Sequence, residues 1–205
     1  MLVRSVFPSH SDVTPDVTSG DEALWTSFKT GNALALSVLY KKHVQPLYSY
    51  GIHTCRDHDM VMDCLQELFL RLWKNKDTLA DVKAARPYLF KSFRRILMHQ
   101  VTECRKEKTA KVFDEGTFEL LPSAETTIID AEAREEILQR LRHCIASLTK
   151  GQREIIYLRF FQGLSYQEVA DVTEIQVDSV YNLVSKTIDL LRKKMQVTKP
   201  LVALR

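Results

Sequence analysis

The sequence contains little glycine and little proline, with 6 of each in 205 residues. Both residues are common in tight turns, so their scarcity argues against an all-β architecture and favours long helices. No apolar run approaches the roughly 18 residues of a membrane span, and residues 1–20 lack the apolar core of a secretory signal. We therefore expect an all-α, cytoplasmic protein without membrane insertion, which opens on a disordered arm over residues 1–20.

Residue patterns typical of metal sites and enzymes are also missing. The four cysteines form no CxxC pair and are scattered along the chain, at Cys55, Cys64, Cys104 and Cys144. Reduced thiols are the expected state. His53, Cys55 and His58 come nearest to a metal cluster, but they lie across an apparent helix break, so we expect no metal. Since neither a phosphate-binding glycine loop nor a nucleophile signature is present, we expect no cofactor and no enzymatic activity.

The chain divides into segments by its periodicity. Helical patterning runs over residues 21–108, and residues 109–131 lose it and are acidic, which predicts a flexible linker. Helical patterning returns over residues 132–196, before a tail of residues 197–205. This organisation predicts two small helical domains. The net charge of +3 is modest, so a nucleic-acid partner must be argued from where the charges lie.

The clearest helix covers residues 57–75. Asp57 stands at its start, where a carboxylate suits the helix dipole. Glycines upstream, at Gly31 before Asn32 and at Gly51, predict breaks between shorter helices. Apolar residues at helical spacing define the buried face of the helix: Val61, Cys64, Leu65, Leu68, Phe69 and Leu72.

A second strong helix follows Pro87, which fits a first helical turn because its missing N–H costs nothing there. The expected buried residues of this helix are Leu89, Phe93, Ile96, Leu97 and Val101. Glu103 is the one acid on the rest of its surface, which carries Lys91, Arg94, Arg95, Arg105 and Lys106. The pattern predicts a basic helix with aromatic side chains among the cations.

Residues 165–191 have the pattern of a helix-turn-helix. Ser165 and Glu168 fit a capping box that opens the first helix. Ile175 is expected to fill the space between the helices, and Asp178 to cap the second. The expected buried stripe of that helix is Val180, Leu183, Val184, Thr187, Ile188 and Leu191.

The outward face of the second helix follows by elimination. It carries Ser179, Asn182, Ser185, Lys186 and Asp189, with Tyr181 on the flank. Asn can bond the N6/N7 edge of adenine in a major groove, and Ser can serve several bases. Lys186 and the run Arg192, Lys193, Lys194 suit phosphates, which position rather than specify. The alternative interpretation is an ordinary helical hairpin with a solvated face.

Three stretches together resemble bacterial extracytoplasmic-function (ECF) sigma factors. DCLQELFLRLW, residues 63–73, resembles the core helix of sigma domain two, and RPYLFKSFRRILMHQVTECRK resembles the helix that follows it. LTKGQREIIYLRFFQGLSYQEVADV resembles sigma domain four. The resemblance covers about residues 21–195. It implies domain two over residues 21–108, domain four over residues 132–196, and a protein that binds core RNA polymerase and promoter DNA.

The resemblance also implies roles for individual residues in domain two. The face that family members dock on the polymerase β′ subunit matches Asp63, Gln66, Glu67 and Arg71. The region that opens the −10 promoter element matches the loop at residues 77–86 and the helix after it, with Tyr88, Lys91, Arg94, Arg95 and His99. Cations and rings of this kind suit single-stranded DNA. Arg95 and His99 replace residues common in the family, so the −10 base preference cannot be copied from relatives.

In domain four, the resemblance implies −35 promoter binding by Ser179, Tyr181, Asn182, Ser185, Lys186, Arg192 and Lys193. Many relatives carry cations where this chain has Tyr181 and Leu183. Because the electrostatic part of DNA affinity grows with the number of neutralised phosphates, we expect weaker autonomous −35 binding than in a typical member. A partner is therefore expected, either an anti-sigma factor or a separate DNA-targeting protein.

A helix-turn-helix regulator that acts without polymerase is the alternative from another class. Such a protein would have no need for the stretch LQELFLRLW, which resembles a polymerase-docking helix. Co-purification with core polymerase would distinguish the two.

Overall fold

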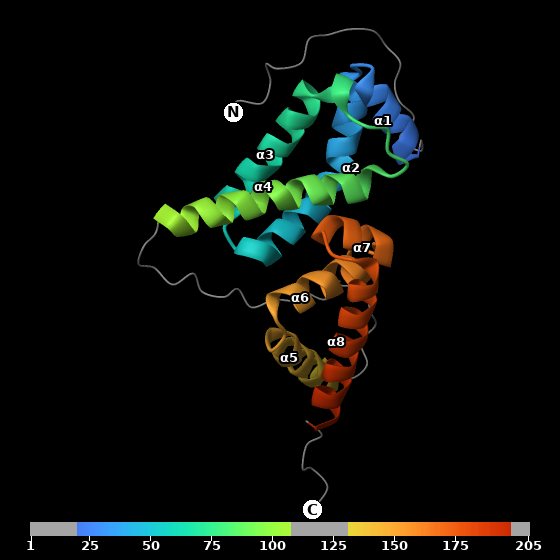
Figure 1. Ribbon diagram of the computed structural model, residues 1–205. Coiled ribbons are helices and arrows are strands. Elements are labelled where there is room, and N and C mark those ends of the chain that lie inside the picture. The colour runs from blue at the N-terminus through green and yellow to red at the C-terminus, as the bar shows by residue number, and fades with distance from the viewer. Residues whose placement is uncertain (1–19, 108–130, 198–205) are drawn as a thin grey trace, which may run out of the picture. The chain divides into compact units, whose positions relative to one another are not determined.

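The computed structural model describes residues 20–107 and 131–197, and over these ranges the chain is helical and contains no strand (Figure 1). The predicted all-α class is confirmed. The chain divides into two compact units, Met1–Lys111 and Val112–Arg205, which we call unit 1 and unit 2. The predicted arm, acidic linker and tail lie outside the described residues, apart from residues 20, 131 and 197.

Over residues 20–107, unit 1 is a bundle of four α-helices with one short 3₁₀ turn. In chain order its elements are α1 (Asp21–Lys29), α2 (Ala33–Cys55), α3 (His58–Lys74), η1 (Lys76–Thr78) and α4 (Ala85–Glu107). The long α2 packs against α1, α3 and α4, and α3 packs against α4. The core combines leucines with large aromatic side chains, of which Trp25, Phe28, Tyr50, Phe90 and Phe93 are fully buried. Rings of this size bury large apolar areas, which stabilises a small bundle.

The two predicted helices of this unit are confirmed. Asp57 caps α3 by accepting a hydrogen bond from the backbone N–H of Met60 at 3.0 Å, and all six residues of the predicted α3 stripe are buried. In α4, four of the five residues expected in the core are buried, and Val101 is half-buried. Phe90, which the pattern did not assign to the core, is also fully buried.

One predicted helix break is right and the other is wrong. Gly31 has φ +93 and separates α1 from α2, whose N-terminus is capped by Asn32. Gly51 lies inside α2, so the break predicted there does not exist. A Cβ at this position would lie 2.8 Å from Val61 Cγ1 and 3.1 Å from Phe93 Cζ. Glycine is there because it lets α3 and α4 approach, and α2 ends instead at Cys55, followed by Arg56 in the left-handed conformation.

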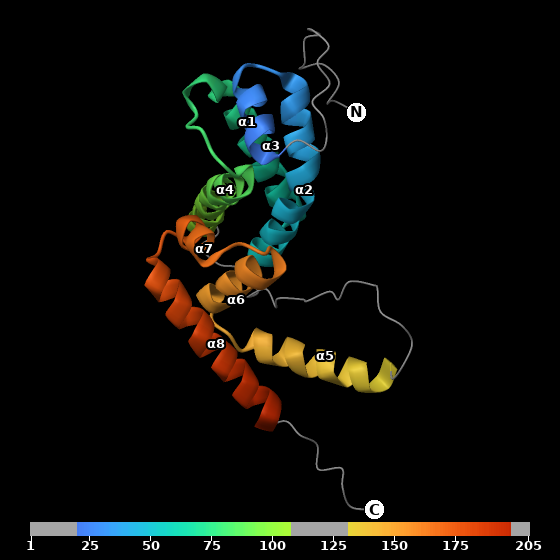
Figure 2. The ribbon, with the colours of Figure 1, turned by 90° about the vertical axis from the view of Figure 1, so that its right-hand side faces the viewer.

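Unit 2 contains four α-helices and a π-helical turn in the described residues. Its elements are α5 (Ala131–Ala146), α6 (Lys150–Ile156), η2 (Tyr157–Phe161), α7 (Tyr166–Thr173) and α8 (Val177–Val197). The long α8 packs against α5, α6 and α7 (Figure 2). The buried residues of α8 lie on one face of the helix, and the opposite face is exposed.

Local chemistry explains the helix starts in unit 2. Thr149 and Gln152 form a capping box on α6, and the predicted capping box of Ser165 and Glu168 on α7 is confirmed. Between these helices the chain turns at Gly163, which has φ +65.

Two details of the predicted helix-turn-helix are wrong. Ile175 is 36% exposed and does not fill the space between the helices. Its backbone N–H donates a hydrogen bond to the Ala170 carbonyl at the end of α7, and the buried residue nearby is Thr173. The second helix begins at Val177, so Asp178 lies in its first turn instead of capping it. A carboxylate in this first turn still suits the helix dipole.

Candidate functional site

One face of α3 carries the four residues that the sequence assigned to polymerase. Asp63, Gln66, Glu67 and Arg71 follow helical spacing on the side away from the buried stripe. Asp63, Gln66 and Arg71 are exposed, and Glu67 is half-buried. Arg71 forms a salt bridge with Glu67 one turn earlier, which holds both side chains along the helix. We call this surface, together with Leu70, the α3 face.

Leu70 is the residue of the α3 face that the sequence reasoning missed. Its side chain is 61% exposed and lies one turn after Gln66 and Glu67 on the helix surface. The available signal was its position, since Leu70 falls outside the apolar stripe that Leu68, Phe69 and Leu72 continue. A large apolar side chain surrounded by charged ones is typical of the centre of a protein–protein contact.

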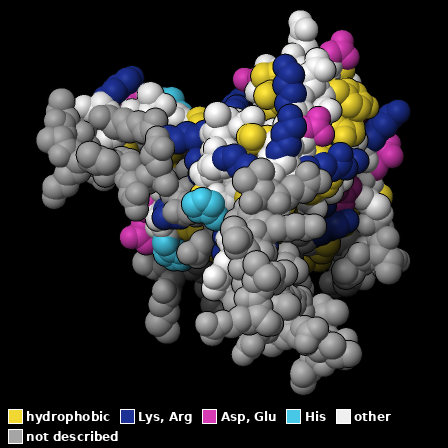
Figure 3. All heavy atoms as spheres, turned by 90° about the horizontal axis from the view of Figure 1, so that it is seen from below, with side chains coloured by type: hydrophobic (Ala, Val, Ile, Leu, Met, Phe, Trp, Pro, Cys, Tyr) yellow, Lys and Arg dark blue, Asp and Glu magenta, His cyan; other side chains and the backbone are white. Residues whose placement is uncertain are grey.

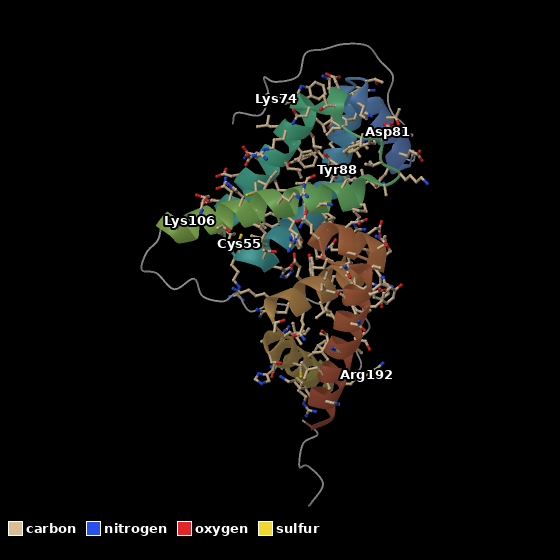
Figure 4. The ribbon with its side chains drawn as sticks, viewed as in Figure 1. Cys55, Lys74, Asp81, Tyr88, Lys106 and Arg192 are labelled. Carbon is tan, nitrogen blue, oxygen red and sulfur yellow. The ribbon has the colours of Figure 1, made fainter. Side chains whose placement is uncertain are left out.

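A row of cations and rings runs along α4. Tyr88, Lys91, Arg95 and His99 follow one another at helical spacing, with Arg94 at the margin. Arg95 and His99 are exposed, whereas Tyr88, Lys91 and Arg94 are half-buried. We call these five residues the α4 row. Figure 4 labels Tyr88 near the start of the helix and Lys106 near its end.

Tyr88 has a structural contact as well as a partly exposed surface. Its ring meets Trp25 edge to face, with centroids 5.0 Å apart and an interplanar angle of 65°. This contact fixes the ring at the start of the α4 row. Phe93, another ring of the same helix, is fully buried and belongs to the core.

The loop before α4 is fastened to α1 by contacts that no sequence pattern indicated. The indole Nε1 of Trp25 donates a hydrogen bond to the Ala80 carbonyl at 3.0 Å. Lys29 Nζ lies 2.5 Å from Asp81 Oδ1, and Asp81 is labelled in Figure 4. Because Trp25 is buried and Asp81 is exposed, the hydrogen bond to Ala80 is better shielded from water than the Lys29–Asp81 pair and is the stronger anchor. We call residues 79–84 the α1-anchored loop.

The outward face of α8 matches the prediction made by elimination. Its five predicted side chains are all exposed, at Ser179, Asn182, Ser185, Lys186 and Asp189. On the inner side, Val180, Val184 and Thr187 are buried, and the other three stripe residues are half-buried. We call the exposed residues from Ser179 to Lys186, with Tyr181, the α8 face. Tyr181 is 52% exposed and its ring stacks on Tyr166 of α7.

The basic end of α8 is less available for phosphates than its sequence indicates. Arg192 Nη1 lies 3.7 Å from Asp189 Oδ1, and Lys194 bonds the Ser147 hydroxyl of the segment after α5. Lys193 is exposed. Asn182 and Arg192 are ten residues apart, or about 15 Å along the axis, so they would meet different parts of a duplex. Arg192 is labelled in Figure 4. Figure 3 views the molecule from below and shows Lys and Arg side chains next to hydrophobic ones on that side.

Buried titratable groups lie away from these surfaces. His43 of α2 is almost fully buried, and desolvation lowers its pKa despite Asp21, whose Oδ2 is 3.6 Å from His43 Nε2. Burial raises the pKa of the Cys64 thiol to about 11 and also raises the pKa of Cys55. Both thiols are therefore protonated and weakly nucleophilic at neutral pH.

Within residues 20–107 and 131–197, no three His, Cys, Asp or Glu side chains are grouped so as to hold a metal ion. None of the helices in the described part of the chain is both long enough and apolar enough to cross a bilayer. The surfaces with chemical character are thus the α3 face, the α4 row and the α8 face. A helical bundle and a second unit with an exposed helix-turn-helix define an all-α DNA-binding protein.

Comparison with known proteins narrows this class. Residues 39–106 match the family model of Sigma-70 region 2, and residues 138–190 match that of Sigma-70, region 4. The ECF RNA polymerase sigma factor SigX of Bacillus subtilis is 27% identical over 172 residues, covering 79% of this chain and 84% of SigX. The ECF RNA polymerase sigma factor SigK of Mycolicibacterium vanbaalenii is 26% identical over 199 residues, covering 94% of this chain and 97% of SigK.

Two solved structures share the fold. CnrH, solved in complex with the cytosolic domain of CnrY, has a TM-score of 0.60 at 19% identity and covers 90% of this chain and 100% of CnrH. The sigma factor RpoE of Bartonella quintana, solved with the anti-sigma factor NepR, has a TM-score of 0.59 at 21% identity and covers 78% of this chain and 96% of RpoE.

The two matched regions together cover more than half of the chain. The chain belongs to the extracytoplasmic-function group of sigma-70 factors. It is a sigma factor, which binds core RNA polymerase and directs promoter recognition in transcription initiation. A regulator that acts without sigma activity is not favoured, because such a protein would not need the region 2 match of unit 1.

Proposed function

We propose that the three surfaces divide the work of initiation, with the α3 face docking on core polymerase. The observation that carries this proposal is the exposed Leu70 within a charged surface, at a position where the helix needs no further apolar side chain for its core. Leu70 supplies apolar contact, and Asp63, Gln66 and Arg71 supply polar contacts around it. This arrangement of an apolar centre and a polar rim suits a specific interface.

The α4 row and the α1-anchored loop hold the opened −10 element. Lys91, Arg94 and Arg95 neutralise phosphates, and Tyr88 offers a ring edge near the loop, where an extruded base is held. Trp25 and Lys29 keep the loop in place, so the loop is organised before DNA arrives. His99 places a titratable group at the far end of the row.

The α8 face enters the major groove of the −35 element. Asn182 and Ser185 contact base edges, and Lys186 contacts a phosphate. Arg192 and Lys193 contact the duplex backbone further along the helix. Arg192 is close to Asp189, and Lys194 bonds Ser147, so phosphate contacts contribute little to the affinity for DNA. Binding of the −35 element therefore depends on the polymerase-bound state.

A protein partner regulates this factor. CnrH and RpoE, which share its fold, were each solved with a partner protein. The small number of cations on the α8 face favours either an anti-sigma factor that controls release or a separate protein that assists DNA targeting. The factor works in the cytoplasm, where core polymerase is found, and catalyses no reaction itself.

The proposal is tested by transcription in vitro from a promoter library. Core polymerase with the full chain is expected to initiate at promoters that share one pair of −10 and −35 motifs. Core polymerase alone should not select them. A protein that binds DNA but leaves core polymerase unable to initiate at any library member would contradict the proposal.

A further inference from the structure

Tyr181 differs from its neighbours on the α8 face. Among the described residues of α8, it is the one large hydrophobic side chain that is exposed, with 52% of its surface accessible. Its exposed neighbours on the helix surface are Ser185, one turn later, and Asp178, one turn earlier, and Asn182 follows on the same exposed side. An exposed ring near the start of a helix that enters a groove is placed to meet a base edge.

The ring of Tyr181 is held in position by a neighbouring helix. It stacks on the ring of Tyr166, the first residue of α7, with centroids 4.0 Å apart and an interplanar angle of 21°. Tyr166 is itself fixed, because the preceding Ser165 forms the capping box with Glu168, with bonds of 2.7 Å and 3.2 Å. The stack therefore joins the starts of both helices of the helix-turn-helix.

A guanidinium reinforces this stack from the π-helical turn. Arg159 Cζ lies 4.8 Å from the centre of the Tyr166 ring, at the distance of a cation–π contact. Arg159 Nη1 also donates a hydrogen bond to the Leu164 carbonyl at 3.1 Å. Arg159 of η2 thus contacts Tyr166 of α7, which in turn stacks on Tyr181 of α8. A ring held in this way loses little conformational freedom when it meets a ligand.

We propose that Tyr181 is a specificity-determining residue of the −35 reader, which recognises the C5-methyl group of a thymine, and that Tyr166 is its positioning residue. Thymine alone among the four bases presents a methyl group in the major groove, where apolar side chains contact it. Neighbouring Asn182 can bond an adenine through N6 and N7. The pair Tyr181–Asn182 therefore favours a −35 element with A·T pairs at adjacent positions. Base contact by a fixed ring replaces part of the affinity that further cations would supply.

This inference rests on the proposed −35 role of the α8 face. It is tested with the full chain bound to core polymerase and a promoter selected from the library. Each thymine of the −35 element is replaced in turn by deoxyuracil, which removes the methyl group and leaves every hydrogen-bonding group unchanged. For the wild type, one replacement is expected to weaken binding about fourfold, the effect of one buried methyl group.

Three variants locate the contact and its support. Tyr181→Ala should bind the thymine and deoxyuracil promoters equally, so the fourfold ratio falls to about one. Tyr166→Ala should also lower the ratio of thymine-promoter to deoxyuracil-promoter affinity, although Tyr166 does not touch the base. Tyr166→Phe, which keeps the stacked ring, should retain the wild-type ratio of affinities. The dependence of affinity on salt concentration should be the same in all four proteins, because no phosphate contact is altered.

The failure of this inference differs from the failure of the −35 proposal. If wild-type holoenzyme binds the −35 element specifically but every deoxyuracil promoter binds as well as the parent, the methyl contact does not exist. If Tyr181→Ala retains the penalty, another residue makes the contact. If Tyr166→Ala shows the same ratio of thymine-promoter to deoxyuracil-promoter affinity as the wild type, Tyr166 has no positioning role. If the −35 sequence has no effect on binding at all, the role of the α8 face and the inference that rests on it both fall.

Discussion

Gly51 lies where α2 meets α3 and α4, and its missing side chain is what allows the contact. Glycine inside a helix normally costs about 1 kcal/mol relative to alanine. At Gly51 that cost is offset, because a Cβ would overlap Val61 and crowd Phe93. Gly151 in α6 has no heavy atom within 4 Å of where its Cβ would be. Close packing thus explains the glycine at position 51, whereas no packing contact requires one at position 151.

Gly51→Ala is expected to destabilise unit 1 by about 1–3 kcal/mol, the usual cost of overpacking a core. The matched change Gly151→Ala should stabilise unit 2, by up to about 1 kcal/mol, through helix propensity alone. Both tryptophans of the chain lie in unit 1, so urea unfolding followed by tryptophan fluorescence reports on that unit. A Gly51→Ala protein as stable as the wild type would contradict the close packing of α2 on α3 and α4.

His43 makes unit 1 sensitive to mild acid. Its pKa is lowered in the folded state, chiefly by burial, while Asp21 raises it and Lys42 and Arg86 lower it further. The folded protein therefore binds fewer protons here than the unfolded chain, so stability is full above the unfolded pKa of about 6.5 and decreases as the pH falls below it.

We expect the free energy of unfolding of unit 1 to fall as the pH is lowered below about 6.5. His43→Gln should flatten this dependence, whereas His58→Gln, a change at an exposed histidine, should leave it intact. The measurement is urea unfolding at a series of pH values. Equal pH slopes for the wild type and His43→Gln would show that another group is responsible.

At the scale of elements, α1 supports the α1-anchored loop, although it precedes the residues that match Sigma-70 region 2. Leu24, Trp25 and Phe28 bury its inner face. Trp25 and Lys29 then reach the loop more than 50 residues away in sequence. The helix thus contributes both to the core and to the shape of the proposed −10 site.

Trp25→Phe keeps an aromatic ring in the core but removes the hydrogen bond to the Ala80 carbonyl. The lost hydrogen bond is expected to cost about 0.5–1.5 kcal/mol, and the smaller ring in this buried position adds a cavity cost. Binding of single-stranded −10 DNA by the holoenzyme should weaken severalfold, because the loop is no longer held, while affinity for core polymerase is unchanged. Trp73→Phe, which leaves the Trp25–Ala80 bond intact, is the control. Unaltered −10 binding by Trp25→Phe would show that the anchor has no role in DNA recognition.

Sequence patterns predicted the elements better than their contacts. The α3 stripe and the α7 capping box depend on residues within a few turns of each other, so local spacing was sufficient to find them. Gly51 was misread because a glycine that ends a helix and one that permits close packing look the same in sequence. The Trp25–Ala80 bond and the Tyr166–Tyr181 stack join residues from different elements, which only the folded chain brings together.

At the scale of the whole molecule, the proposed function is divided between two compact units. Unit 1 carries the α3 face and the α4 row, and unit 2 carries the α8 face. Neither unit needs a catalytic group for these tasks, since positioning DNA on a polymerase requires complementary surfaces. The division also explains why the α8 face can have few cations, because core polymerase would hold both units on one promoter.

Transcription in vitro with a variant of the α3 face tests the central claim most directly. Core polymerase is combined with the full chain carrying Leu70→Glu, or with Lys41→Glu, a charge reversal at an exposed position of α2, as the control. A charge at the centre of an apolar contact typically costs more than about 2 kcal/mol, so Leu70→Glu should reduce initiation at least roughly tenfold at limiting protein. Lys41→Glu should initiate like the wild type. Normal initiation by Leu70→Glu would contradict docking through the α3 face, and no initiation by the wild-type chain would contradict sigma activity itself.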